Sequence, residues 1–182
     1  MSVITDRPTV PAQRVPTKPV ASPPVTSRSR LETVVEKAAD LLTAHSVAVL
    51  RISLGTVFLV FAAFKYVPGA SPAEGLAIAT VDKLTLGLVS GNTALLVTAL
   101  TETVIGLTLV SGRFLKVGVL VLAGALVGIM SPLVLFPDQM WSGNGPTLVG
   151  QYVFKDIVLA AAGLVVAAHA LGARLRRDVS SD

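Results

Sequence analysis

Five charged residues lie within or at the edge of apolar stretches, and these are the side chains that could carry chemistry: Arg51, Lys65, Glu102, Lys155 and Asp156. Glu102 lies at the centre of a run of about eighteen residues, Thr93 to Val110, that contains no other charge. Such a run is long enough to cross a bilayer, and a carboxylate at its centre costs a few kcal/mol to insert. Intramembrane acids are therefore usually paired and functional. Glu102 could relay protons, hydrogen-bond a quinone-like ligand, or hold helices together through an ion pair.

The spacing around Glu102 predicts that it faces protein and not lipid. Thr98, Glu102 and Gly106 recur at intervals of four, which places them on one stripe of a helix. Gly106 would let a neighbouring helix approach closely, and Thr98 could hydrogen-bond across the contact.

The depths of the charges suggest how they pair. With a rise of 1.5 Å per residue, Lys155 and Glu102 should differ in depth by only about 5 Å. We therefore expect Lys155 to pair with Glu102, and Asp156 to pair with Lys65. The five charges sum to +1, which suits internal pairing, or a neutral or weakly anionic ligand, better than a cation pathway.

Arg51 and Lys65 are fourteen residues apart, about four helical turns, and share a face with Gly55, Phe58 and Ala62. Two interpretations stay open. Each side chain could snorkel to its own membrane interface, or both could turn into the bundle.

The elements that must position these residues are four membrane spans. The composition is 52% hydrophobic and 14% charged, whereas a soluble domain has about 25% charged residues. The expected fold is an all-α bundle of four transmembrane helices. Their predicted ranges are Val47 to Tyr66, Thr93 to Val110, Phe114 to Phe136 and Leu148 to Leu171.

The third predicted span carries its own packing and breaking signals. Gly124 and Gly128 form a GxxxG pattern, which predicts close packing against another helix. Pro132 is expected to kink or end the span.

The segments flanking the bundle differ from it in composition. Residues 1–28 hold six of the eleven prolines and no periodic apolar face, so we predict a disordered tail. Residues 29–46 show apolar residues at helical spacing, and Ser29 and Glu32 have capping-box spacing. This segment is predicted to be an amphipathic helix on the membrane surface. Residues 47–172 form the four-helix domain, and residues 173–182 form a basic tail.

Two connecting loops have distinct signals. In the loop after the first span, Ser71 as cap, Pro72 at the first helical position and Glu74 predict a short surface helix. The loop after the third span is rich in Gly and Pro and is predicted to be irregular, with Trp141 anchored at the interface.

The basic residues predict the topology. Lys and Arg gather in the N-terminal segment, in the tight loop with Arg113 and Lys116, and after residue 173, while the two other loops hold only Lys83 and, at a boundary, Lys65. By the positive-inside rule both termini lie in the cytoplasm. This placement of basic residues also argues against nucleic acid as a partner.

Composition excludes several kinds of chemistry. The chain has no cysteine, so it has no disulfide, thiolate metal site or cysteine nucleophile. We expect no metal site. His45 and His169 both fall near the cytoplasmic interface, but interfacial histidines without a ligand role are far commoner than paired haem ligands, so haem is not expected.

Short motifs in all four spans resemble those of DoxX-like membrane proteins. Arg51-x-x-Leu54-Gly55 followed by Lys65 resembles the family's first helix, with Ala62 in place of the usual glycine. Glu102-x-x-x-Gly106, then Gly112-Arg113, is similar to the second helix. Ser131-Pro132 and the run Gly150 to Asp156 (GQYVFKD) resemble the YkgB-type branch and DoxD-like proteins.

The resemblance covers about residues 47–172 and implies a four-helix protein of a prokaryotic plasma membrane. Some DoxX-like proteins look like small subunits of quinone-reducing oxidoreductases, and others are associated with oxidative stress. It implies a membrane subunit, not an enzyme on its own, that is non-catalytic or contributes to a quinone site beside a membrane protein partner or a second copy. The alternative is a structural subunit whose charges only fix helix packing. A small transporter or proton channel ranks third, because four spans are few.

Overall fold

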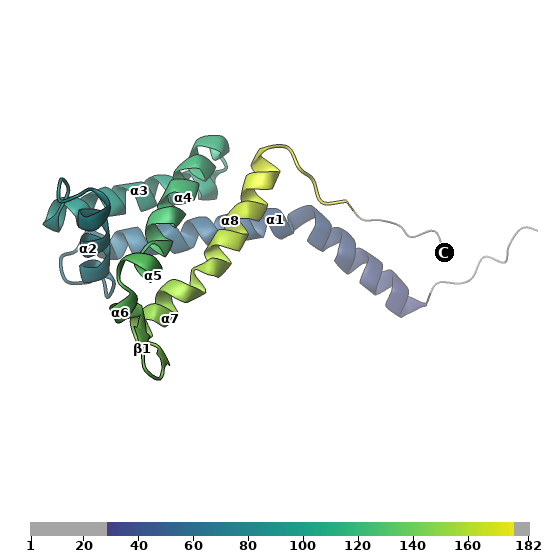
Figure 1. Ribbon diagram of the computed structural model, residues 1–182. Coiled ribbons are helices and arrows are strands. Elements are labelled where there is room, and N and C mark those ends of the chain that lie inside the picture. The colour runs from purple at the N-terminus through teal and green to yellow at the C-terminus, as the bar shows by residue number, and fades with distance from the viewer. Residues whose placement is uncertain (1–28, 177–182) are drawn as a thin grey trace, which may run out of the picture.

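The computed structural model describes residues 29–176 of the chain as a mostly helical fold (Figure 1). The predicted disordered tail, residues 1–28, lies outside the described residues, as does the end of the predicted basic tail. In chain order the elements are α1 (Arg30–Lys65), α2 (Glu74–Leu84), α3 (Gly91–Ser111), α4 (Leu115–Met130), α5 (Pro132–Leu135), α6 (Pro137–Met140), β1 (Trp141–Ser142), β2 (Gly145–Pro146), α7 (Leu148–Lys155) and α8 (Ile157–Ala170).

Four helical segments of the described chain are long and apolar enough to cross a membrane. They are α1, α3, the run from Leu115 to Leu135 and the run from Leu148 to Ala170. The four predicted spans are thus confirmed as helices, each within a few residues of its predicted bounds except at the start of α1.

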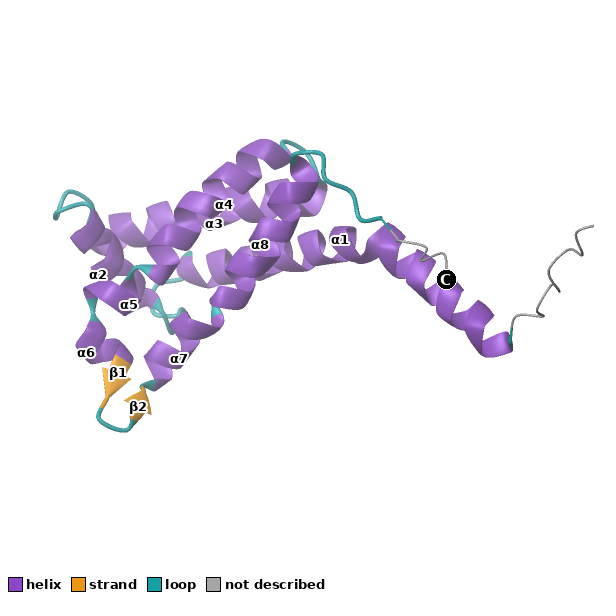
Figure 2. Ribbon diagram, turned by 45° about the vertical axis from the view of Figure 1, so that its right-hand side comes forward, coloured by secondary structure: helices purple, strands orange, loops and turns teal. Residues whose placement is uncertain are grey.

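The four segments pack in a ring. α1 contacts α3 and α8, and α4 contacts the same two helices from the other side. α3 and α8 therefore occupy opposite corners of the bundle. The core lies where the helices meet, around Phe58, Ile105, Leu122 and Val166. Figures 1 and 2 show α4 and α8 crossing obliquely over α1.

α1 joins two segments that the sequence pattern separates. It is one helix of 36 residues, begun by the predicted capping box between Ser29 and Glu32. Its first part projects away from the bundle and changes direction (Figure 1). There it exposes apolar side chains, among them Leu31, Val35 and Leu42.

Two glycines bring α1 and α3 into close contact. A Cβ on Gly106 would lie 2.5 Å from Leu59 Cγ and 2.8 Å from the Gly55 carbonyl oxygen. A Cβ on Gly55 would lie 2.9 Å from Leu109 Cβ. The predicted close approach at Gly106 is therefore confirmed, with α1 as the neighbour.

We call residues 111–116 together with 169–176 the basic end of the bundle. α3 and α4 are joined there by a tight turn. Gly112 ends α3 in the left-handed conformation with φ 72°. α4 then packs closely on α3, because a Cβ on Gly118 would collide with Thr108. Gly124 and Gly128 have no atom within 4 Å of an added Cβ. The packing predicted for this GxxxG pair is thus wrong for the described part of a single chain.

The opposite end of the bundle, which we call the loop end, contains α2, α5, α6 and the β1–β2 hairpin (Figure 2). Pro132 separates α4 from α5, as predicted. The loop predicted to be irregular instead forms α6 and an antiparallel pairing of Trp141 with Pro146. The Thr147 hydroxyl begins α7 by accepting a hydrogen bond from the Gly150 amide at 3.0 Å.

α2 is the predicted surface helix, but it begins later than expected. Its first residue is Glu74, and no side chain caps it. The Glu74 carboxylate instead accepts a hydrogen bond from the Gly69 amide at 2.8 Å, so it braces the preceding turn. Lys83 fastens the other end of α2 to the bundle by donating to the Leu135 carbonyl at 3.0 Å.

Candidate functional site

A buried ion pair between Lys65 and Glu102 joins α1 to α3. Lys65 Nζ lies 2.8 Å from each oxygen of the Glu102 carboxylate. The two side chains are only 6% and 8% exposed. The Lys65 ammonium also lies 5.7 Å from the centre of the Phe61 ring. The protein therefore surrounds both charges and neutralises them against each other.

Helix direction explains why Lys65, at the end of α1, reaches a carboxylate in the middle of α3. Side chains on an α-helix lean towards the N-terminus of that helix. α1 and α3 are antiparallel, since Arg51 contacts Leu109 while Lys65 contacts Glu102. Lys65 and Glu102 consequently lean towards each other along the helix axis.

The predicted pairings of Lys155 with Glu102 and of Asp156 with Lys65 are wrong. Similar depth does not make two residues neighbours. The span that carries Lys155 packs on α1 and α4, and it stands diagonally across the bundle from α3. Lys65, on the helix that does pack against α3, takes Glu102 as its partner.

Arg51 turns into the bundle at the other end of the α1–α3 contact. Its guanidinium donates to the Leu109 carbonyl and, at 3.4 Å, to the Val110 carbonyl. These carbonyls belong to the last turn of α3, which has no helical donors for them and carries a partial negative charge. Of the two interpretations of Arg51 and Lys65, the inward one is therefore confirmed for both, and Gly55, Phe58 and Ala62 on the same stripe are buried.

Lys155 and Asp156 lie apart from that contact, at a break between α7 and α8. Asp156 ends α7 and precedes α8, and its side chain is half-buried. Lys155 is exposed, and its ammonium lies 4.4 Å from the centre of the Tyr152 ring one turn earlier. Within residues 29–176, neither side chain forms an ion pair with another helix.

A second contact beside the ion pair was not predicted. The hydroxyls of Tyr66 and Thr103 lie 3.0 Å apart, and each residue directly follows a member of the Lys65–Glu102 pair. No sequence pattern points to this contact, because only the antiparallel packing of α1 and α3 brings the exposed Tyr66 side chain to Thr103.

The five predicted site residues thus form two separate groups and no single site. Arg51, Lys65 and Glu102 tie α1 to α3, while Lys155 and Asp156 lie in the fourth span. Two pockets at the basic end are lined by side chains other than these five. His169 lines both pockets and His45 lines neither. No cluster of three or more His, Asp or Glu side chains that could hold a metal occurs in the described chain.

Comparison with known proteins finds no matching family, no similar curated protein and no similar solved structure.

Proposed function

We propose that this protein is a non-catalytic subunit of a membrane assembly, in which the buried charges fix the packing of the helices. The Lys65–Glu102 pair carries the proposal. Both carboxylate oxygens accept from the same ammonium, and both side chains are enclosed. A proton relay or a quinone site needs a polar group that water or a ligand can reach, and the enclosure of this pair argues against both roles.

Lys155 and Asp156 suggest where the partner binds. Both lie well inside the fourth candidate span, from Leu148 to Ala170. Lys155 is exposed and Asp156 is only half-buried, and within residues 29–176 neither forms an ion pair with another helix. Charged groups at such depth usually face protein or water, because lipid solvates them poorly. A partner helix, or a second copy of this chain, that covers the α7–α8 break would supply the missing polar contacts.

The type of assembly follows from the resemblance alone. The DoxX-like motifs favour a redox or oxidative-stress assembly in a prokaryotic plasma membrane. Within that proposal, contribution to a quinone site is the second candidate, and the observation that favours it is again the exposed Lys155 beside the half-buried Asp156. A quinone bound between this face and a partner could hydrogen-bond both side chains.

Copurification in mild detergent tests these proposals, with mass spectrometry of the recovered proteins and small molecules. The double variant Lys155→Gln, Asp156→Asn should weaken binding of the partner about thirtyfold, since two interhelical polar contacts contribute about 1 kcal/mol each. The matched control, Arg113→Gln with Asp138→Asn, changes one exposed base and one exposed acid outside the spans. The variant Lys65→Met, Glu102→Leu should retain the partner.

Each result has a distinct meaning. Equal recovery with all variants would contradict docking through the α7–α8 break. Loss of the partner or of a bound quinone in the Lys65→Met, Glu102→Leu variant, with folding intact, would contradict a purely structural pair. A quinone that is lost only with the Lys155 and Asp156 changes would support the second candidate.

A further inference from the structure

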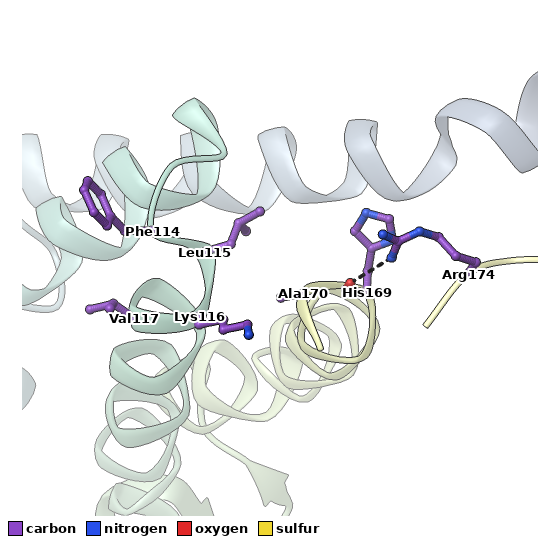
Figure 3. Close-up of a pocket in the computed structure, with 7 residues that line it drawn as sticks. All are labelled: Phe114, Leu115, Lys116, Val117, His169, Ala170 and Arg174. Atoms are coloured by element: carbon purple, nitrogen blue, oxygen red, sulfur yellow. Dashed lines mark hydrogen bonds between the residues drawn. The ribbon is translucent and has the colours of Figure 1, made fainter. Parts of the chain in front are cut away.

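Two open pockets at the basic end share His169 and Arg174. The first, of about 470 Å³, lies between the start of α4 and the end of α8 and includes Leu115 and Lys116. The second, of about 420 Å³, lies between the end of α8 and the middle of α1. Figure 3 shows Lys116 extending from α4 towards α8, and the Arg174 guanidinium hydrogen-bonded to the His169 carbonyl oxygen.

The first pocket is electropositive. Its charged lining residues are Lys116 and Arg174, and it includes no acidic side chain. Arg174 uses Nη1 to donate to the carbonyls of His169 at 3.2 Å and Ala173 at 2.9 Å. A guanidinium has five N–H donors, so others stay free for a ligand. The Lys116 ammonium makes no hydrogen bond or ion pair with any residue from 29 to 176.

The start of α4 adds to the positive potential. No side chain caps this helix. The first backbone amides of α4 that donate a hydrogen bond are those of Val117 and Gly118, both to the Phe114 carbonyl, so the amides of Leu115 and Lys116 have no such partner in the described chain. Unpaired amides at a helix N-terminus favour an anion.

Apart from His169, the rest of the lining is apolar and lies at the ends of two candidate spans. Phe114, Leu115, Val117 and Ala170 complete the first pocket, and the Phe114 side chain is 78% exposed. The spans begin at Leu115 and end at Ala170, so the pocket lies at the depth where lipid headgroups meet acyl chains. A free phosphate would gain nothing from the apolar lining. A phospholipid matches both the basic side chains, through its phosphate, and the apolar lining, through its acyl chains.

We propose that the pocket between α4 and α8 binds the phosphate headgroup of an anionic phospholipid. Lys116 and Arg174 hold the phosphate, and the acyl chains lie against Leu115 and Ala170. Asp40, which lines the second pocket, sets a limit on the site. The phosphate stays on the α4 side of Arg174, away from that carboxylate.

Native mass spectrometry of the full-length protein, released from nanodiscs with equal amounts of phosphatidylglycerol and phosphatidylcholine, tests the proposal. The wild type should retain phosphatidylglycerol over phosphatidylcholine. Lys116→Gln with Arg174→Gln should retain about thirtyfold less, since each of the two basic residues contributes about 1 kcal/mol of attraction to anionic lipid. The matched control is Arg113→Gln with Arg176→Gln, which removes two exposed charges from the same segments outside the pocket.

Three outcomes would overturn the proposal. Equal loss in the pocket variant and the control would mean attraction to net charge only. Displacement of the lipid by millimolar inorganic phosphate would mean a site for a soluble anion. A defect in Lys116→Arg with Arg174→Lys as large as that of the neutral pair would mean that charge is not the cause. Retained folding is checked by thermal unfolding in phosphatidylcholine nanodiscs.

Discussion

Three long basic side chains in this protein obey the same directional rule. Arg51, Lys65 and Lys155 each extend towards the N-terminus of their own helix, where they meet α3 carbonyls, Glu102 and the Tyr152 ring respectively. Because of this rule, the position of each residue along its span decides whether its side chain points towards the middle of the bundle or towards the near end. Lys65 leans into the bundle and is buried, whereas Lys155 leans towards the near end of its span and stays exposed.

Removing one member of the buried pair should cost far more stability than removing both. Glu102→Leu or Lys65→Met alone strands a charge, and breaking a buried pair in this way costs about 3–5 kcal/mol. The double variant Lys65→Met, Glu102→Leu replaces the pair with apolar side chains. Its free energy of unfolding should lie within about 1 kcal/mol of that of the wild type. Unfolding in micelles with increasing dodecyl sulfate measures all four proteins. Additive losses in the double variant would show that the two charges do not depend on each other.

The members of the site could be predicted from the sequence, but their partners could not. Glu102 and Lys65 stand out because they are charged in or beside apolar runs. Depth alone then paired Glu102 with Lys155, because depth says nothing about which helices are neighbours. The direction of helical side chains was the signal that argues against snorkelling of Lys65. Because Lys65 lies at the end of its span, a side chain directed towards the helix N-terminus points towards the middle of the bundle and not towards the interface.

At the scale of elements, the α1–α3 contact depends on the absence of a side chain at Gly106. A Cβ there meets Leu59, which can move, and the Gly55 carbonyl at 2.8 Å, which cannot move without shifting α1.

Gly106→Ala should therefore lower the free energy of unfolding by about 1–3 kcal/mol through overpacking. Gly124→Ala is the matched control, since an added Cβ there has no atom within 4 Å, and alanine is the better helix former by up to about 1 kcal/mol. We expect it to be neutral or slightly stabilising. The same dodecyl sulfate titration compares the two, and equal effects would contradict the packing at Gly106.

Elements with strong periodicity or a strong breaker were predictable, and those set by tertiary contacts were not. The spans, the Ser29 capping box and the break at Pro132 follow from local sequence. The β1–β2 hairpin does not, because it depends on Gly150 packing against the Met140 backbone. The late start of α2 has a similar cause, since Glu74 binds the Gly69 amide and not a helix terminus.

At the scale of the whole molecule, the distribution of basic residues predicts that the basic end faces the cytoplasm. The chain contains no cysteine, so single cysteines can report the topology without background. Asn144→Cys, in the hairpin turn, should react with a membrane-impermeant maleimide in intact cells. Arg30→Cys and Arg113→Cys should react only after lysis. The reverse pattern would overturn the predicted orientation.

The buried pair also has a consequence for the order in which the chain enters the membrane. Lys65 precedes Glu102 by 37 residues, so the ribosome delivers the cation first. When α3 enters the bilayer, Lys65 is already present in α1, so Glu102 need not enter the hydrocarbon without its partner. We therefore expect membrane insertion of the second span to depend on the first, because synthesis from Lys65 towards Glu102 provides the cation before the carboxylate.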